Sequence, residues 1–399
     1  MANVSSSNGL EKYPKLRFPC FDQPYTVSPL SNYLFENTER NRDLLFDKED
    51  VLSVSGEFGV VNQIEFQGRS FAGESVAEYH VVNTKDVVYT KSPLKANPYG
   101  IIKTNKGVPG IVSTLYAVYH PKEGTDPLYV EYYFGNDLRL NKFLKPLVNI
   151  GAKHDMKVNN EFVLTGEVCF PSVIEQQKVV EFLSCLDRRI EKQRCLVEHL
   201  KKYKRGVSIA IFDRKISLTK NSPSWIKTTV GEICKITMGQ SPDSESYNTD
   251  QIGIPLVQGN ADMRNRITCP QRYTSKPTKI CEKGSIILSV RAPVGSVGRA
   301  DRTVCLGRGV CAINSDNNDF LYYFFERNEP YWKRIEQGGT FTAISGDDIA
   351  DMLIDYPSLE ERQKIADFLL KIDTHIAVEE NMLNQLLALK SGLLQQLFI

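Results

Sequence analysis

The chain has 399 residues, of which 41% are hydrophobic and 24% charged, and its formal net charge is only +1. A chain of this length can form two or three domains with their own cores, and the composition is typical of a water-soluble globular protein. No apolar run approaches the roughly 18 residues that span a bilayer, and the first residues lack a signal-peptide pattern, so we expect a cytoplasmic protein without membrane contact.

In chain order, we expect a polar tail over residues 1–13 and then a first globular unit over residues 14–171. Runs of β-branched and aromatic residues, separated by Gly, Pro and Asn, predict its strands. The clearest predicted elements are strands at residues 51–55, 86–90 and 111–119 and a short helix at residues 128–134. A unit of this kind has a mixed α+β fold.

A second mixed α+β unit is predicted over residues 222–357, after a linker at residues 213–221. Ser and Pro in residues 220–227 are typical of such a domain boundary. The clearest predicted elements of this unit are strands at residues 285–290 and 310–313 and an amphipathic, aromatic helix at residues 320–334.

The most informative feature is a stretch of about 43 residues that occurs twice, from Phe170 to Phe212 and from Tyr356 to Phe398. The two copies are offset by about 186 residues, and about 13 of their 43 residue pairs are identical. Each copy begins with Pro-Ser-x-x-Glu, and Ser-x-x-Glu fits the capping box that starts a helix. The repeat therefore predicts two long helices, over residues 172–212 and 358–399.

Apolar residues recur in both copies at alternating steps of four and three, which is the pattern of a coiled-coil seam. The predicted pairing residues are Val179, Leu183, Leu186, Ile190, Val197, Leu200, Ile365, Leu369, Ile372, Ile376, Leu383, Leu386 and Leu393. A helix of about 39 residues extends about 58 Å, too far to bury such a stripe in a small domain. We expect the two helices to pair as an antiparallel coiled coil with approximate two-fold symmetry within the chain. A zipper to another chain is the alternative.

Polar residues interrupt the seam at equivalent places, Gln193 and Lys204 in the first copy and Glu379 and Lys390 in the second. An antiparallel pair would bring Lys204 near Glu379 and Gln193 near Lys390, which would specify the register. The alternative is that these side chains extend to solvent.

Positive charge is concentrated between Gln258 and Gly309, where ten basic and three acidic residues give about +7 over roughly 50 residues. Arg offers bidentate contacts to guanine, and Asn or Gln to adenine. The candidate DNA-binding residues of the second unit are Gln240, Gln258, Asn260, Arg264, Arg266, Arg291, Arg299, Arg308 and Thr340. Those of the first unit are Lys91, Lys95, Tyr99, Lys103, Lys106, Lys153 and His154.

Half or more of such contacts go to the DNA backbone, so each candidate is either a base contact, a phosphate contact or a solvated charge. Arg291 is the strongest single candidate, because it lies between a predicted strand and a Pro-Val-Gly turn. The alternative is a structural arginine that pairs with a nearby acid.

No metal-binding or catalytic motif is visible. The nine cysteines include no Cys-x-x-Cys pair, which favours reduced, buried thiols, and neither Cys nor His shows metal-ligand spacing. A Walker A loop, a dinucleotide-binding loop and the common hydrolase motifs are also missing from the sequence. We therefore predict no catalytic residue and no metal.

Several short segments together form a recognisable pattern: Pro14–Pro19, Pro171–Lys178, Met238–Pro242, Ser246–Tyr247, Pro255–Asn260, Leu288–Gly295, Gly307–Gly309, Gly339–Ile344 and Pro357–Lys364. With these segments the chain resembles, over nearly its whole length, the DNA-specificity (S) subunits of type I restriction-modification systems, the HsdS family. One departure is Arg362, which separates Glu361 from Gln363 where the family often has adjacent Glu and Gln.

The resemblance implies a non-catalytic DNA reader. Each unit would be a target-recognition domain that reads one half of a bipartite, asymmetric site in double-stranded DNA. The paired helices would set the spacing of the halves and dock two modification subunits, which methylate adenine with S-adenosylmethionine. Two restriction subunits would add ATP- and Mg-dependent activity, and this chain itself would hold no cofactor. The alternatives are a stand-alone DNA methyltransferase or nuclease, and a coiled-coil scaffold without a DNA role.

Overall fold

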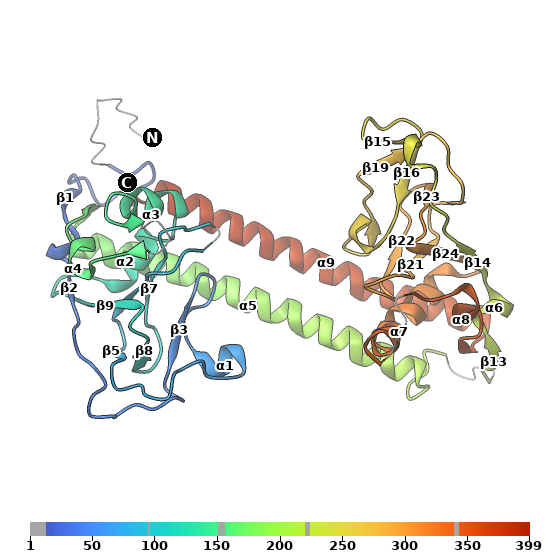
Figure 1. Cartoon of the computed structure of the whole chain (residues 1–399), viewed down its shortest axis with the longest axis horizontal. Coiled ribbons are helices and arrows are strands. Elements are labelled where there is room, and N and C mark those ends of the chain that lie inside the picture. Colours follow the sequence, from blue (N-terminus) through green and yellow to red (C-terminus); the bar gives the residue numbers. More distant parts are fainter. Residues whose placement is uncertain (1–12, 95, 151–155, 220–223, 339–342) are drawn as a thin grey trace. The chain divides into compact units, whose positions relative to one another are not determined.

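The computed structural model describes residues 13–94, 96–150, 156–219, 224–338 and 343–399 (Figure 1). The chain divides into two compact units, one of residues up to Gln193 with Met382–Ile399 and one of Arg194–Asn381. Each unit contains a sheet-rich domain and one part of each of two long helices, α5 (Val173–Phe212) and α9 (Leu359–Gln396). The predicted fold of two mixed helix-and-sheet domains with two long helices is confirmed.

The first domain is built on a four-stranded antiparallel sheet in the order β2-β9-β6-β7. The strands of this unit are β1 (Thr26–Pro29), β2 (Leu34–Glu36), β3 (Leu52–Ser55), β4 (Gly59–Asn62), β5 (His80–Val82), β6 (Val87–Thr90), β7 (Ile102–Thr104), β8 (Gly110–Val112), β9 (Tyr116–Pro121), β10 (Asn149–Ile150), β11 (Met156–Lys157) and β12 (Glu167–Phe170). Its shorter helices are η1 (Leu30–Asn32), α1 (Gln63–Gln67), α2 (Pro127–Tyr133), α3 (Asp137–Leu144) and α4 (Asn160–Val163).

The single strand predicted over residues 111–119 is wrong. Two strands, β8 and β9, occupy this stretch, and they are separated by a turn in which the Tyr116 amide donates to the Ser113 carbonyl over 3.0 Å. The turn redirects the chain, because β8 pairs with β5 whereas β9 pairs with β2 and β6. The apolar pattern continues through the turn, so it does not mark the break.

The second domain contains a six-stranded sheet, β14-β24-β21-β22-β18-β17, and a five-stranded sheet, β15-β19-β16-β23-β20. Its strands are β13 (Ile226–Thr229), β14 (Lys235–Met238), β15 (Tyr247–Asn248), β16 (Ile254–Val257), β17 (Met263–Arg264), β18 (Ile267–Thr268), β19 (Arg272–Thr274), β20 (Ile280–Cys281), β21 (Ile286–Ser289), β22 (Val297–Arg299), β23 (Val304–Leu306), β24 (Val310–Asn314) and β25 (Leu353–Tyr356). Its shorter helices are α6 (Val230–Ile233), η2 (Ser244–Ser246), η3 (Asn260–Asp262), α7 (Asn318–Gly338) and α8 (Gly346–Ala350).

Each domain closes by pairing its first strand with its last. β1 pairs with β12, and Thr26 lies opposite Phe170, whereas β13 pairs with β25, and Ile226 lies opposite Tyr356. Residues 226 and 227, which the Ser and Pro pattern assigned to a boundary, therefore belong to a strand of the second domain. Because β12 leads into α5 and β25 into α9, both long helices begin at equivalent places.

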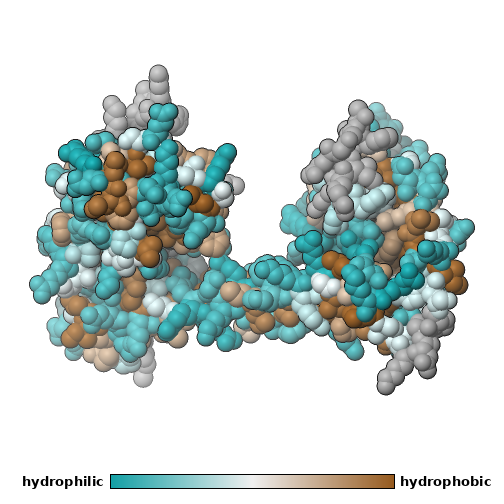
Figure 2. Space-filling view, turned by 90° about the horizontal axis from the view of Figure 1, so that it is seen from below, coloured by the Kyte–Doolittle hydropathy of each residue, from teal (hydrophilic) through white to brown (hydrophobic). Residues whose placement is uncertain are grey.

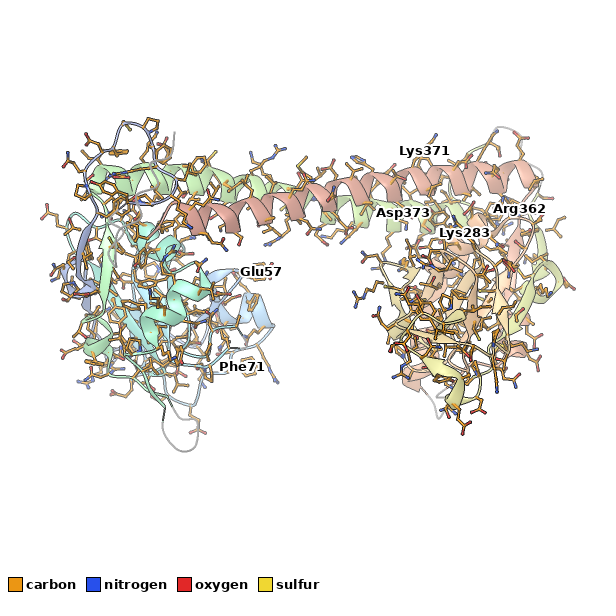
Figure 3. The ribbon with its side chains drawn as sticks, turned by 90° about the horizontal axis from the view of Figure 1, so that it is seen from above. Glu57, Phe71, Lys283, Arg362, Lys371 and Asp373 are labelled. Atoms are coloured by element: carbon orange, nitrogen blue, oxygen red, sulfur yellow. The ribbon has the colours of Figure 1, made fainter. Side chains whose placement is uncertain are left out.

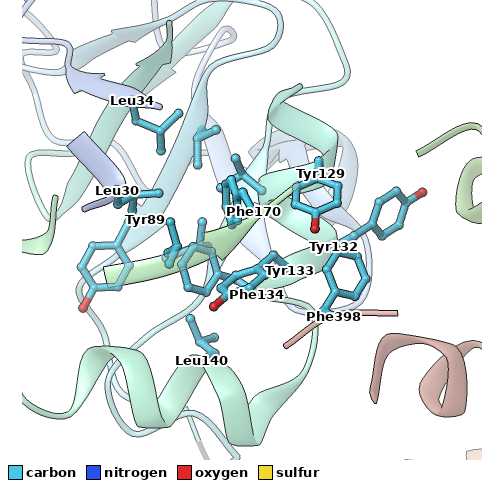
Figure 4. Packing of buried hydrophobic residues seen from close by; sticks show 14 of the residues in the cluster. Leu30, Leu34, Tyr89, Tyr129, Tyr132, Tyr133, Phe134, Leu140, Phe170 and Phe398 are labelled. Atoms are coloured by element: carbon cyan, nitrogen blue, oxygen red, sulfur yellow. The ribbon is translucent and has the colours of Figure 1, made fainter. Parts of the chain in front are cut away.

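Each long helix begins at one domain, and the phenylalanine at its end is buried against a shorter helix of the other domain. In the first unit, the Phe398 ring lies 5.1 Å from that of Tyr129 and 6.1 Å from that of Tyr133 (Figure 4). In the second unit, the Phe212 ring lies 5.4 Å from that of Phe320. Since Phe212 and Phe398 are equivalent in the repeat, each helix starts from one domain and ends in the core of the other unit.

The start of each helix is held by a buried glutamate. The Glu175 carboxylate accepts from the Arg17 guanidinium over 2.7 Å and from the Tyr25 hydroxyl over 3.1 Å. The equivalent Glu361 accepts from Trp225 Nε1 over 3.0 Å, and its amide donates to Ser358 Oγ over 3.4 Å. The described contacts thus include the serine half of the predicted capping box at Ser358, and both carboxylates bind side chains of the domain.

Arg362, the departure noted in the sequence, occupies the position that Gln176 has in the first copy. Both side chains donate to the carbonyl of the proline that precedes the helix, Gln176 to Pro171 and Arg362 to Pro357, each over 3.1 Å. Arg362 also donates to Asp316 over 2.6 Å. The arginine therefore keeps the local contact of the glutamine and adds an ion pair to the domain.

Within the second unit the two long helices run antiparallel. Lys204 of α5 lies 2.6 Å from Asp373 of α9, and Lys201, which comes earlier on α5, lies 2.9 Å from Glu380, which comes later on α9. In Figure 3, Lys371 points away from the second domain, whereas Asp373 lies on the side of α9 toward it. Lys204 pairs with Asp373 and with Glu326, and Lys390 pairs with Asp187, rather than with the predicted Glu379 and Gln193.

The thirteen predicted pairing residues are all buried or half-buried. Those near the ends of the helices also pack into the domains. Val179, Leu183 and Leu393 join the core of the first domain, and Ile365 and Leu369 join that of the second. Some of the predicted pairing residues thus pack into the cores of the domains as well as lying along the long helices.

Candidate nucleic-acid interface

Three loops of the second domain meet beside the end of β16. They follow β14 at residues 239–241, follow β16 at residues 258–259, and join β23 to β24 at residues 307–309. The Gln240 amide donates to the Leu306 carbonyl over 2.9 Å, and the Gly307 amide donates to the Val257 carbonyl over 2.8 Å. These backbone bonds make one continuous surface from the three loops, which we call the loop cluster.

Glycine is required where the loops touch. A Cβ atom at Gly309 would lie 2.1 Å from the Gln258 carbonyl oxygen, and one at Gly239 would lie 2.1 Å from the Gly307 carbonyl oxygen. Both distances are far below van der Waals contact, so any larger residue would separate the loops. The glycines of the Gly-Arg-Gly and Met-Gly-Gln sequences are therefore needed because the backbones of the loops lie close together there.

Three predicted DNA-binding residues are presented by the loop cluster. Gln240 and Arg308 are exposed, and Gln258 is half-buried. A fourth, Arg291, follows β21, where the Val290 amide donates to the Gly309 carbonyl over 2.9 Å. Arg291 is exposed, and among the described residues its side chain has no acidic partner. The structure thus brings together residues from four separate segments of the sequence.

Two other predicted residues serve the fold of the domain. Arg266 makes a bidentate ion pair with Glu329, at 2.5 and 3.0 Å, and its Nε lies 3.2 Å from Glu326. Burial lowers the pKa of Arg266, but these carboxylates outweigh that effect and raise it. Arg299 pairs with Asp319 and lies 4.1 Å from the centroid of the Tyr322 ring.

These ion pairs reduce the positive charge that faces solvent, because Arg266, Arg299 and Arg302 are neutralised by acids. The concentration of charge in the sequence therefore overstates the positive surface. The exposed cations of this region that form no ion pair within the described residues are Arg264, Arg272, Lys276, Lys279, Lys283, Arg291 and Arg308. Asn260 is half-buried and begins η3.

The predicted residues of the first unit are more dispersed. Lys91 donates to Asn160 over 3.2 Å in a hollow that Glu36 also lines, and burial lowers its pKa. Lys106 pairs with Glu131 of α2 at 3.0 Å, and burial lowers the pKa of the neighbouring Lys103. Tyr99 is half-buried against the core. Lys95, Lys153, His154 and Thr340 lie outside the described residues.

Sequence reasoning missed two residues that contact the loop cluster through Gln258. Gln258 Nε2 donates to the Tyr247 hydroxyl over 3.3 Å, and Arg272 donates to Gln258 Oε1 over 3.5 Å. Tyr247 belongs to the Ser-Tyr match, and Arg272 was counted in the positive charge, so both were visible in the sequence. Their relation to Gln258 arises only because β15, β19 and β16 are neighbours in one sheet.

All nine cysteines are described and occur as thiols. Four of them, Cys169, Cys281, Cys305 and Cys311, are buried, and burial raises the pKa of Cys311 to about 12. The prediction of buried thiols is wrong for the exposed Cys20, Cys185 and Cys195. In the described part of the chain, no group of three or more His, Cys, Asp or Glu residues could hold a metal ion, and no helix is long and apolar enough to cross a membrane.

Comparison with known proteins places the loop cluster within a known type of domain. Residues 223–388 match the family model of the type I restriction modification DNA specificity domain. The chain is 31% identical over 283 residues to the putative type I restriction enzyme MjaX specificity subunit of Methanocaldococcus jannaschii, covering 66% of this chain and 65% of that protein. It is 32% identical over 175 residues to the MjaIX specificity subunit of the same organism, covering 40% of each. The alignments thus span less than two thirds of either relative.

Solved structures show the same fold over nearly the whole chain. The S subunit of a type I restriction-modification system from M. genitalium has a TM-score of 0.61 at 14% identity and covers 97% of this chain and 99% of that one. A chain from a study of the assembly and conformational transition of the type I R-M system also has a TM-score of 0.61, at 23% identity, and covers 95% of this chain and 99% of that one.

Proposed function

Because residues 223–388 match the type I restriction modification DNA specificity domain and solved S subunits share the fold of the chain, we propose that this protein is the sequence-reading subunit of a type I restriction-modification complex. Its two domains read the two halves of a bipartite, asymmetric site in double-stranded DNA. The observation that carries this proposal is the loop cluster, whose three loops carry Gln240, Gln258 and Arg308, together with the adjoining Arg291, because backbone hydrogen bonds hold these four segments side by side. Side chains of this kind recognise base edges and phosphates.

The chain supplies recognition and its partners supply catalysis. Two modification subunits that methylate adenine with S-adenosylmethionine dock on the helices, and two restriction subunits that use ATP and Mg join the assembly. Exposed apolar residues at equivalent positions of the repeat support a partner present in two copies. Leu196 and Met382 are each 41% exposed, and Tyr203 and Leu389 are 55% and 53% exposed. Figure 2 shows hydrophobic side chains interrupting the hydrophilic surface of the helices.

DNA selection tests the proposal. The full chain is co-expressed with candidate modification subunits, and the assembly is used to select from a random duplex library. We expect enrichment of one bipartite sequence and a steep fall in affinity as salt rises, because several phosphates are neutralised. Equal affinity for all sequences would refute DNA reading and favour a scaffold. Binding of S-adenosylmethionine by the chain alone would favour a stand-alone methyltransferase.

The length of the helices provides a second test. Four residues inserted into α5 after Gln193 lengthen that helix by about 6 Å. A matching insertion after Glu379 lengthens α9 at the equivalent place. We expect the doubly extended chain to select the same half-sites with a longer gap. A change of half-site sequence at constant gap would contradict the role of the helices as a spacer.

A further inference from the structure

Gln258 differs from the other polar residues of the loop cluster because its backbone and its side chain are both held. Its amide donates to Asp262 Oδ2 over 2.7 Å, and its carbonyl faces the Cα of Gly309, where a Cβ would lie at only 2.1 Å. Its side chain is half-buried, whereas those of Gln240 and Arg308 are exposed. A residue fixed in this way presents its end group in a defined place.

The two side-chain contacts determine which way the Gln258 carboxamide faces. Arg272 can only donate, so the atom it contacts at 3.5 Å is the carboxamide oxygen. The Tyr247 hydroxyl donates to the Pro242 carbonyl over 3.1 Å, so it accepts from Gln258 Nε2 at 3.3 Å. The nitrogen then retains one N–H, and the oxygen retains one lone pair.

One free N–H beside one free acceptor is the pattern complementary to the major-groove edge of adenine, which offers N7 as acceptor and the N6 amino group as donor. We propose that Gln258 reads a single adenine in the half-site of the second domain, and that Tyr247 and Arg272 are positioning residues that orient its carboxamide. This inference rests on the proposed function and assigns one base of the target to one side chain.

The test uses the assembled complex and a library randomised across the half-site. For Gln258→Ala we expect the adenine preference at one position to fall about tenfold or more, with other positions unchanged, because a bidentate contact is lost. For Gln258→Glu we expect that position to change toward cytosine, since a carboxylate accepts from the cytosine amino group and cannot donate to N7. Gln271→Ala is the matched control, because Gln271 is exposed in the same domain.

Tyr247→Phe tests the positioning role. The hydroxyl contacts Gln258 and Pro242, and its removal leaves the aromatic ring in place. We expect a weaker adenine preference at the same position only, and no further change when Tyr247→Phe is added to Gln258→Ala. A purely structural tyrosine would lower binding to every sequence, and would do so in both backgrounds.

The outcomes separate this inference from the proposed function. A wild-type complex that selects no sequence refutes both. A wild-type complex that selects a site while Gln258→Ala lowers affinity equally for all bases shows a phosphate contact and overturns the inference alone. Broad changes at several positions also overturn it. Thermal unfolding of each variant, with Gln258→Met as a substitution of similar length, distinguishes lost reading from lost folding.

Discussion

Asp187 on α5 and Lys390 on α9 form an ion pair of 2.5 Å in the first unit, and the repeat reproduces this pair with its members exchanged in the second, where Lys204 on α5 lies 2.6 Å from Asp373 on α9. A tyrosine of each domain completes the arrangement. Tyr132 donates to Asp187 over 2.8 Å, and Tyr323 donates to Asp373 over 2.9 Å.

Each set of three residues joins a domain to both helices at once. Tyr132 belongs to α2 and Tyr323 to α7. In each set, the aspartate of one long helix accepts a hydrogen bond from a tyrosine of the domain and forms an ion pair with a lysine of the other long helix. The offset of about 186 residues that relates the helices thus also relates their principal polar contacts. The equivalence of the two copies predicted from the repeat therefore extends to side-chain contacts that no local pattern connects.

Removal of Lys390 should destabilise the first unit. For Lys390→Met we expect a loss of about 1 kcal/mol, because the partly buried Asp187 loses its cation and keeps the Tyr132 hydroxyl as its partner among the described residues. Urea unfolding gives the free energy. Lys178→Met is the control, since Lys178 makes an exposed pair with Glu181, and exposed pairs contribute little to stability. Equal effects of the two changes would contradict a structural role for the Asp187 pair.

The phenylalanines at the ends of the two long helices should each stabilise a different unit. Phe398→Ala should cost about 3–5 kcal/mol in the first unit, and Phe212→Ala should act on the second, because each removes a buried ring from the corresponding core. Hydrogen exchange resolved by peptide shows which domain is weakened. Tyr203→Ala, at an exposed position of α5, should change stability by less than about 0.5 kcal/mol. Loss of protection in the same domain for both phenylalanine variants would refute the assignment.

Buried His80 should make the first unit sensitive to acid. Burial, with smaller contributions from Arg40 and Lys91, lowers the pKa of His80 to about 4. As the pH falls below about 6.5, the unfolded chain takes up a proton that the folded chain accepts only near pH 4, so stability is lost across this window. The loss should approach about 3 kcal/mol.

His80→Gln should therefore flatten the dependence of unfolding free energy on pH between about 6.5 and 4 relative to the wild type. The exposed His199 of α5 provides the matched control, and His199→Gln should leave the profile unchanged. An unaltered acid profile in His80→Gln would show that other groups carry the sensitivity.

Substitutions of two arginines of the second domain should have different effects: one should lower DNA affinity, and the other should lower the stability of the domain. Arg308→Ala should lower DNA affinity and reduce the slope of its logarithm against that of salt concentration by about one, because one exposed cation is removed. Its melting temperature should stay the same. Arg266→Ala should instead cost about 1–2 kcal/mol of stability, because Glu329 and Glu326 lose their partner. The reverse assignment of effects would contradict the sorting of these residues by their ion pairs.

Prediction from sequence worked where the signal is local. The step of three and four residues identified both long helices, because i, i+3 and i+4 neighbours share one face whatever surrounds them. The runs of β-branched residues at 86–90 and 285–290 likewise marked β6 and β21, which both belong to the main sheets. It failed where local continuity hides a turn, as at Ser113–Tyr116 between β8 and β9.

The amino-acid sequence by itself determined the duplicated helices and the α+β character of both domains. Only the tertiary structure decided which charges remain available, because the Arg266–Glu329 pair spans 63 residues and forms through the packing of α7 beside β22. The same holds for Phe398 against Tyr129 and for Gln258 between Tyr247 and Arg272. Periodicity is a property of neighbouring residues, whereas these contacts depend on which distant segments the cores bring together.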